Sequence, residues 1–174
     1  MAHEIDMTTG RPAVMVAGDP PWHKLGQNVS EAQSSSEAMH LAGLDWVVQQ
    51  WNLVARCEGI EHEVTGRVAN IRSDTKAILG VVSTGYRVFQ NRAAFEFFDA
   101  IVQEKLAVYE TAGSLRGGRQ VWILARLPKT LRAAGEDEIR PYVLLTNSHD
   151  GSKALRMIPT TIRVVCANTL NLAL

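Results

Sequence analysis

The stretch AVYETAGSLRGGRQVWILARL, residues 107–127, has the pattern of a β-hairpin. Two apolar-rich runs, 107–115 and 119–127, flank Arg116-Gly117-Gly118. Adjacent glycines supply the positive φ angles of a tight hairpin turn, so the stretch predicts two antiparallel strands. In the second run apolar residues occupy both faces, which is typical of a strand buried on both sides. Those residues are Val121, Ile123 and Ala125 on one face and Trp122 and Leu124 on the other.

Further hairpins are predicted on either side of this stretch. Residues 139–147 and 153–165 flank Ser148-His149-Asp150-Gly151, where Asp-Gly is a turn signal, and Pro159 favours an edge strand because proline donates no backbone hydrogen bond. Strands are also expected at 46–57, 67–72 and 77–83, the last two joined by a turn at 73–76. Residues 1–18 predict an N-terminal hairpin around Thr9-Gly10-Arg11-Pro12.

Three segments have helical patterns. Ser34 with Glu37 forms a capping box that starts a short helix ending near Gly43. Asn91 is a favoured cap for an amphipathic helix that reaches about Lys105. A third helix is expected from Cys166 onward. The sequence therefore predicts an α+β fold of antiparallel sheets built from hairpins, with two or three helices packed on one face.

Length and composition fit one domain over residues 1–174, divided into the hairpin 1–18, a connector 19–33 and a core 34–174. The chain has 174 residues, 46% of them apolar, and no run long enough to cross a bilayer is present. Cys57 and Cys166 form no C-x-x-C motif, so we expect two reduced thiols in a cytoplasm.

Charge is unevenly distributed although the net charge is zero. Residues 1–104 carry 8 Lys and Arg against 13 Asp and Glu, whereas residues 105–174 carry 10 against 5. A basic face of this kind suits an anionic partner, although ordinary solvated charge explains it equally well. The predicted phosphate-binding residues are Arg116, Arg119, Arg126, Lys153, Arg156 and Arg163. The predicted base-stacking residues are Tyr109, Trp122 and Tyr142.

Six blocks of the sequence carry a family resemblance. They are PWHKLG (residues 21–26), AGLDW (42–46), YRVFQNRAAFEF (86–97), ETAGSLRGGRQVW (110–122), TNSHDGS (146–152) and RVVCANTL (163–170). In this order they resemble the phage/plasmid-like proteins grouped as domain of unknown function 932, although Lys24 stands where that motif is usually smaller and neutral. The resemblance implies carriage on phages, plasmids or prophages in a bacterial host, and a longer protein that continues beyond Leu174. It brings no catalytic residues.

Several motifs suggest chemistry, each with a plainer interpretation. Cys166 at a helix start, with His149 as base and Asn168 or Asn147 as orienter, would make a thiol enzyme; a small buried thiol is the simpler explanation. Neighbouring strand residues face opposite ways, so Ser148-His149-Asp150 cannot form a triad.

Two other patterns also favour the plainer interpretation. Glu61-His62-Glu63 lacks further metal ligands and is expected in a charged loop. Residues 113–118 lack the Lys-Ser/Thr pair of a P-loop. No metal or cofactor is predicted.

The leading prediction is a non-enzymatic protein that binds single-stranded nucleic acid, or anneals strands, in phage or plasmid replication and recombination. The order helix, two hairpins, helix is similar to the core of single-strand annealing recombinases, which assemble as rings, so a homo-oligomer is expected. The first alternative is a protein-interaction or assembly module without nucleic-acid binding. The thiol enzyme centred on Cys166 is the second.

Overall fold

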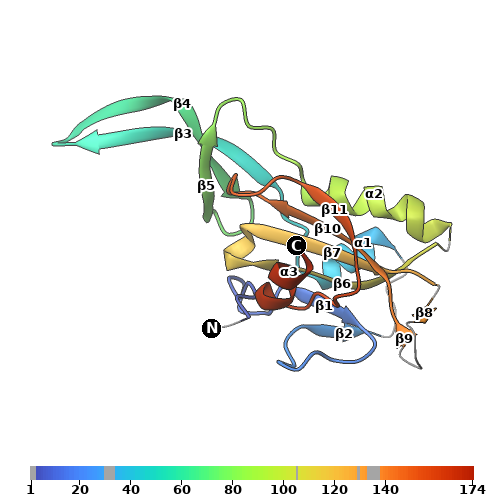
Figure 1. The fold of residues 1–174 in the computed structure, drawn as a ribbon. Coiled ribbons are helices and arrows are strands. Elements are labelled where there is room, and N and C mark those ends of the chain that lie inside the picture. The colour runs from blue at the N-terminus through green and yellow to red at the C-terminus, as the bar shows by residue number, and fades with distance from the viewer. Residues whose placement is uncertain (1–2, 30–33, 105, 129, 133–137) are drawn as a thin grey trace.

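The body of the protein is a six-stranded sheet with the strand order β11-β10-β7-β6-β1-β2 (Figure 1). The computed structural model describes residues 3–29, 34–104, 106–128, 130–132 and 138–174. Neighbouring strands are antiparallel except β1 and β2, which are parallel. The strands are β1 (Val14–Ala17), β2 (Gln27–Val29), β6 (Val108–Leu115), β7 (Gln120–Arg126), β10 (Tyr142–Ser148) and β11 (Arg156–Thr160). A short pair, β8 (Leu131–Arg132) and β9 (Glu138–Ile139), stands apart.

Helices cover both faces of this sheet. On one face, α1 (Ser35–Leu41) and α2 (Asn91–Gln103) pack over Met15, Ala112 and Ile123. On the other, α3 (Ala167–Ala173) packs over a second cluster that includes Trp122 and Leu124. Because side chains alternate between the faces of a strand, β7 supplies both cores, as its doubly apolar sequence predicted. The α+β prediction is confirmed, with two helices on one face and the third opposite.

A second sheet, in the order β3-β4-β5, extends away from the body (Figure 1). It consists of β3 (Val48–Cys57), β4 (Ile60–Arg72) and β5 (Ile78–Ser83). β5 pairs with β4 only over Arg67–Ile71, so the hairpin beyond that point has no third strand. We call residues 53–66 of this hairpin the arm. All of them are exposed except Leu53, which is half-buried.

Local signals placed several elements correctly. Ser34 caps α1, and its Oγ accepts a hydrogen bond from the Glu37 backbone N–H at 3.2 Å. The turns at 73–76, 116–118 and 148–151 all lie between paired strands, and Pro159 lies on β11 at the edge of the sheet. In each case the deciding chemistry belongs to residues that are close in sequence.

Other expectations were wrong. The hairpin predicted for residues 1–18 is not found in the described residues 3–18. β1 pairs there with β6 and β2, and Ile5 forms an isolated bridge with Leu115. Asn91 is the first residue of α2 and its cap is Gln90. Glu61-His62-Glu63 lies inside β4, paired with Val54–Arg56, and not in a loop. The helix end expected near Lys105 falls outside the described residues.

Candidate interaction surface around the root of the arm

The six predicted phosphate-binding residues separate into two groups at opposite ends of the six-stranded sheet. Arg116 and Arg119 lie at the β6–β7 turn, and Lys153 lies in the β10–β11 connection. Arg156 begins β11 at the same end. Arg126 ends β7 at the other end, where Arg163 meets Glu110 near the start of β6. The two ends therefore have to be considered separately.

At the end away from the arm, Arg126 and Arg163 are both paired with one buried carboxylate. Glu110 is buried, and its two carboxylate oxygens lie 3.2 Å from Arg126 Nε and 2.6 Å from Arg163 Nε. Arg163 also donates hydrogen bonds to the backbone oxygens of Ala17 and Asp19. These side chains, with Arg140 and Glu138, line a charged hollow of about 320 Å³. Arg163 thus connects the segment before α3 to the end of β1 through hydrogen bonds.

At the arm end, Arg116 is paired with Glu4 at 2.5 Å, but Arg119, Lys153 and Arg156 have no ion pair within the described residues. Arg119 and Lys153 both adjoin the β10–β11 turn. The His149 N–H donates to the Arg119 backbone oxygen at 2.7 Å, and the Lys153 N–H donates to Ser148 Oγ at 3.1 Å. The structure therefore brings Arg119 and Lys153 to one turn.

Asp150 is the carboxylate of this turn, and its Oδ1 already accepts hydrogen bonds within the turn. Ser148 Oγ donates to Asp150 Oδ1 at 2.7 Å, and the Ser152 backbone N–H donates to the same oxygen at 2.8 Å. Burial raises the pKa of Asp150, but these hydrogen bonds and the nearby Arg119 charge outweigh it and hold the pKa below its ordinary value.

The predicted stacking residues are core residues, so that prediction was wrong. Trp122, Tyr109 and Tyr142 are all buried. The Trp122 indole N–H donates to Thr111 Oγ1, and the Tyr109 hydroxyl donates to Asp99 Oδ1 at 3.0 Å, so both polar atoms are satisfied inside the protein. A covered ring offers no face to a nucleic-acid base. The exposed ring near the arm is Trp51, 48% exposed, with Lys76 Nζ 6.0 Å from its centre.

A buried polar junction holds the second sheet on the body. Asn70 of β4 donates from Nδ2 to the His149 backbone oxygen at 2.7 Å. Asn91 donates to the backbone oxygens of Leu44 and Trp46, so its Oδ1 is an acceptor and His149 Nε2, 2.9 Å away, must carry the proton. Burial lowers the pKa of His149 to about 4, so the imidazole is neutral.

Arg72 is the charged member of this junction. It is 1% exposed, forms an ion pair with buried Asp6, hydrogen-bonds Asp74, and stacks 4.6 Å from the Trp46 ring centre. The His149 ring packs against the same indole in a T-shaped arrangement, with the ring centroids 5.4 Å apart. Sequence reasoning missed these residues as a group because they come from segments far apart in the chain. The network fixes the direction in which the arm leaves the body.

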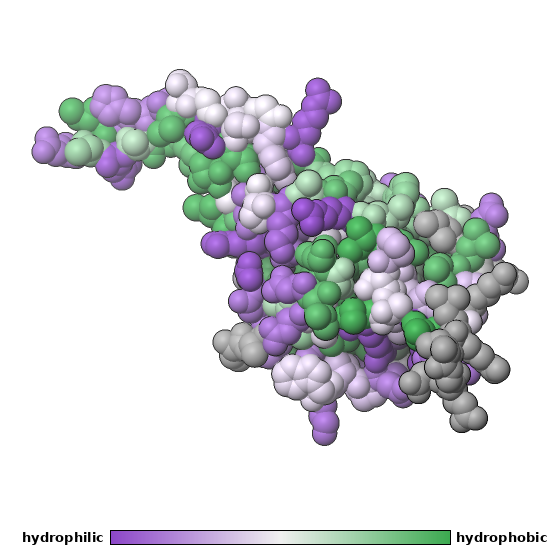
Figure 2. Space-filling model, viewed as in Figure 1, coloured by the Kyte–Doolittle hydropathy of each residue, from purple (hydrophilic) through white to green (hydrophobic). Residues whose placement is uncertain are grey.

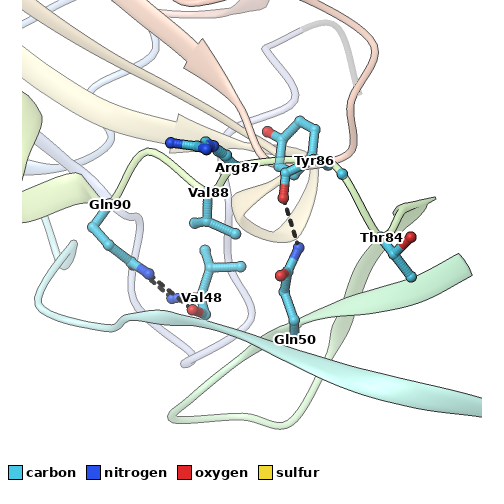
Figure 3. Close-up of a pocket in the computed structure, with 8 residues that line it drawn as sticks. Val48, Gln50, Thr84, Tyr86, Arg87, Val88 and Gln90 are labelled. Atoms are coloured by element: carbon cyan, nitrogen blue, oxygen red, sulfur yellow. Dashed lines mark hydrogen bonds between the residues drawn. The ribbon is translucent and has the colours of Figure 1, made fainter.

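A groove of about 650 Å³ lies beside β3, where the arm meets the body (Figure 3). Its lining consists of Val48, Gln50, Thr84, Gly85, Tyr86, Arg87, Val88 and Gln90. The Gln90 carboxamide accepts from the Val48 N–H and donates to the Val48 oxygen, both at 2.9 Å, as a neighbouring strand would. Gln50 Nε2 donates to the backbone oxygen of Tyr86 at 3.2 Å, and the Tyr86 hydroxyl donates to the backbone oxygen of Ser148. The loop 84–90 therefore bridges the two sheets.

The described residues give little support to a catalytic centre. Cys166 is buried, and its Sγ contacts Thr169 Oγ1, while His149 contacts Asn91; no contact joins Cys166 to His149 among the interactions described. Within the same ranges, no three His, Cys, Asp or Glu side chains are arranged to hold a metal ion. In the part of the chain described, no helix combines the length and apolar content needed to span a bilayer.

Fold and surface define an antiparallel α+β protein with a projecting hairpin arm and a groove at its root. The sequence profile described as "Domain of unknown function (DUF932)" matches residues 78–174, more than half of the chain. The chain belongs to this family. The blocks at 21–26 and 42–46 lie outside the matched residues. No curated protein and no solved structure matches the chain.

Proposed function

We propose that this protein binds single-stranded nucleic acid at the arm end of the six-stranded sheet. The observation that carries the proposal is the difference between the two ends. Arg126 and Arg163 share the carboxylate of Glu110, whereas Arg119 and Lys153 adjoin one turn without an ion pair in the described residues. Cations that are not neutralised inside the protein can hold phosphate groups.

Recognition in this proposal uses charge and one exposed ring. Arg119, Lys153 and Arg156 contact phosphates, and Trp51 beside Lys76 offers a face on which a base can stack. A surface of this kind reads the backbone and tolerates any sequence, as a strand-annealing or single-strand-binding factor requires. Replication or recombination of a phage or plasmid in the bacterial cytoplasm is the setting that the sequence resemblance supports.

A salt titration with matched variants tests the proposal. Fluorescence anisotropy of a labelled single-stranded oligonucleotide should show affinity that falls steeply with salt. The double variant Arg119→Gln/Lys153→Gln removes two charges, so the log–log salt slope should become shallower by about 1.4, at about 0.7 per phosphate contact on a single strand. The control Arg126→Gln/Arg140→Gln removes the same charge at the other end and should leave the slope unchanged. Equal losses in both variants, or no binding by the wild type at low salt, would exclude this site.

A second candidate function is protein docking through the arm. It is favoured by one specific observation, the exposure of large apolar side chains along the second sheet. Trp51, Val54, Ile60, Ile78 and Val81 are each between 48% and 60% exposed, and Figure 2 shows green side chains where the arm meets the body and along the arm itself. Apolar surface gathered in this way is typical of an interface with another protein.

A further inference from the structure

The two faces of the arm differ in character. β3 alternates so that Trp51, Leu53, Ala55 and Cys57 share one face. Leu53 pairs with Val64, Ala55 with His62 and Cys57 with Ile60, so β4 adds two apolar side chains and one histidine to that face. The other face carries the exposed side chain of Val54 among polar groups, which include an ion pair between Arg56 and Glu61 and a hydrogen bond from Asn52 to Glu63. An apolar strip exposed along a narrow hairpin has no partner within the described part of the chain.

The outer edge of β3 is also open. Val48 has both backbone groups satisfied by Gln90, but the strand continues to Cys57 at the edge of its sheet. Natural edge strands are commonly protected by proline, lysine or a bulge on the edge itself. β3 contains neither proline nor lysine, and the bulge opposite Asn52 and Leu53 lies on β4. The open edge is a template for one more strand.

The distribution of charge indicates which strand could pair with the open edge of β3. The arm from Arg56 to Val64 contains Glu58, Glu61 and Glu63 against Arg56, a net charge of −2. Across the groove, Arg87 is exposed and has no ion pair among the described residues (Figure 3). The loop that carries Arg87 lies on the side of β3 to which Gln50 points, because Gln50 bonds the Tyr86 oxygen. The apolar strip lies on the opposite side of β3.

We propose that β4 of one copy, over Ile60–Val64, adds to the open β3 edge of a second copy of this chain. In that position Ile60 and Val64 continue the apolar strip beside Trp51 and Leu53, and Glu61 and Glu63 face Arg87 of the second copy. The β4 segment is suitable for this pairing. Its five residues span about 17 Å, and their outer edge is unpaired because β5 does not reach them. The inference shares Trp51 with the proposed nucleic-acid site but none of its phosphate-binding cations, so the two proposals can be tested with different substitutions.

The arm and the groove are different patches of one chain, so the contact is heterologous. Every copy offers both patches, and successive contacts either close a ring or extend a chain. Backbone pairing and apolar burial supply the attraction, and the Glu61, Glu63 and Arg87 charges select the partner. The arms of two copies packed on each other would instead be a two-fold contact that leaves Arg87 uninvolved.

Charge exchange provides the test. Sedimentation of nuclease-treated protein should show concentration-dependent assembly of the wild type. Arg87→Glu and Glu61→Lys/Glu63→Lys should each weaken it by about tenfold or more. The control Arg92→Glu reverses an exposed charge on α2 outside the groove and should not weaken it. Combining Arg87→Glu with the two lysine substitutions should restore assembly.

Mixing the two defective proteins tests the heterologous geometry separately. In the mixture the unchanged arm of the Arg87→Glu protein meets the unchanged groove of the other protein, and the Glu61→Lys/Glu63→Lys arm meets the Arg87→Glu groove. The two proteins should therefore assemble in alternation, although neither assembles alone. A wild type that stays monomeric, or a combined variant that fails to recover while its circular dichroism and Tm match the wild type, overturns the proposal. Failure of the Arg119→Gln/Lys153→Gln test would leave this result unaffected.

Discussion

Acidification from pH 7 to pH 5 should weaken the fold through one side chain, His149. This imidazole is 0% exposed, donates from Nε2 to Asn91 Oδ1, and leaves Nδ1 without a partner among the described atoms. Burial lowers its pKa from 6.5 to about 4. Protonation therefore places an uncompensated charge at the junction that holds the second sheet on the body.

The sign and size of the effect follow from linkage. Because the folded pKa lies below the unfolded one, stability is fully present above pH 6.5 and is lost as pH falls toward 4. With pKa values of 6.5 unfolded and about 4 folded, the loss between pH 7 and pH 5 is about 2 kcal/mol. The Asp6 and Asp150 carboxyls, whose pKa values are lowered, lose their contribution only at more acidic pH.

Urea unfolding at the two pH values measures this loss, with His149→Gln as the reference. Glutamine retains an amide N–H that can donate to Asn91 but does not titrate. Burial also lowers the pKa of His23, and that contribution is common to both proteins and cancels in the comparison. The wild type should lose about 2 kcal/mol more than the variant between pH 7 and pH 5. An equal loss in both proteins would refute the assignment to His149.

Two further substitutions test the packing of the junction and the sheet. Arg72→Leu leaves the Asp6 carboxylate buried without its cation, so the free energy of unfolding in urea should fall by about 3–5 kcal/mol. Arg56→Leu removes one member of an exposed pair and should lower it by less than about 1 kcal/mol. Similar losses in the two variants would contradict the role of burial. Gly113→Ala places a Cβ 2.5 Å from Trp122 and 2.6 Å from the Ala13 oxygen, so Tm should fall by an amount corresponding to about 1–3 kcal/mol. Gly85→Ala, whose nearest neighbour is 4.0 Å away, should leave Tm nearly unchanged, and a similar fall there would show that the contact with Trp122 is not the cause.

The arm shows where sequence patterns gave only part of the answer. Strand β3 was expected to end at Cys57, but the next strand was expected only from Arg67, so the outer half of β4 was missed. Glu58 and Gly59 both adopt positive φ, at 50° and 83°, in the tight turn between the strands. The Glu-Gly pair followed by alternating Ile60, His62 and Val64 was the available signal. It was weak because both faces of the arm are exposed and no burial pattern marks the strand.

Asn91 shows a different failure. Its side chain suits a helix cap, and it does stand at the start of α2. Tertiary structure instead gives that side chain the backbone oxygens of Leu44 and Trp46 and the imidazole of His149 as partners. Those partners are 45 or more positions away in the sequence. Propensity identified the position but could not identify the contact.

Residues close together in the chain specify the turns at 73–76, 116–118 and 148–151, the α1 cap and the doubly apolar β7 strand, so these features could be predicted before the fold was known. Contacts between distant segments pair β1 with β6, place Arg126 and Arg163 on the one carboxylate of Glu110, and bury Tyr109, Trp122 and Tyr142 in the core. The residue type gives the charge of a side chain. Whether a cation can contact a ligand depends on whether the fold brings a carboxylate within about 4 Å of it. For this reason only the tertiary structure could distinguish Arg119 and Lys153 from Arg126 and Arg163, which share a carboxylate.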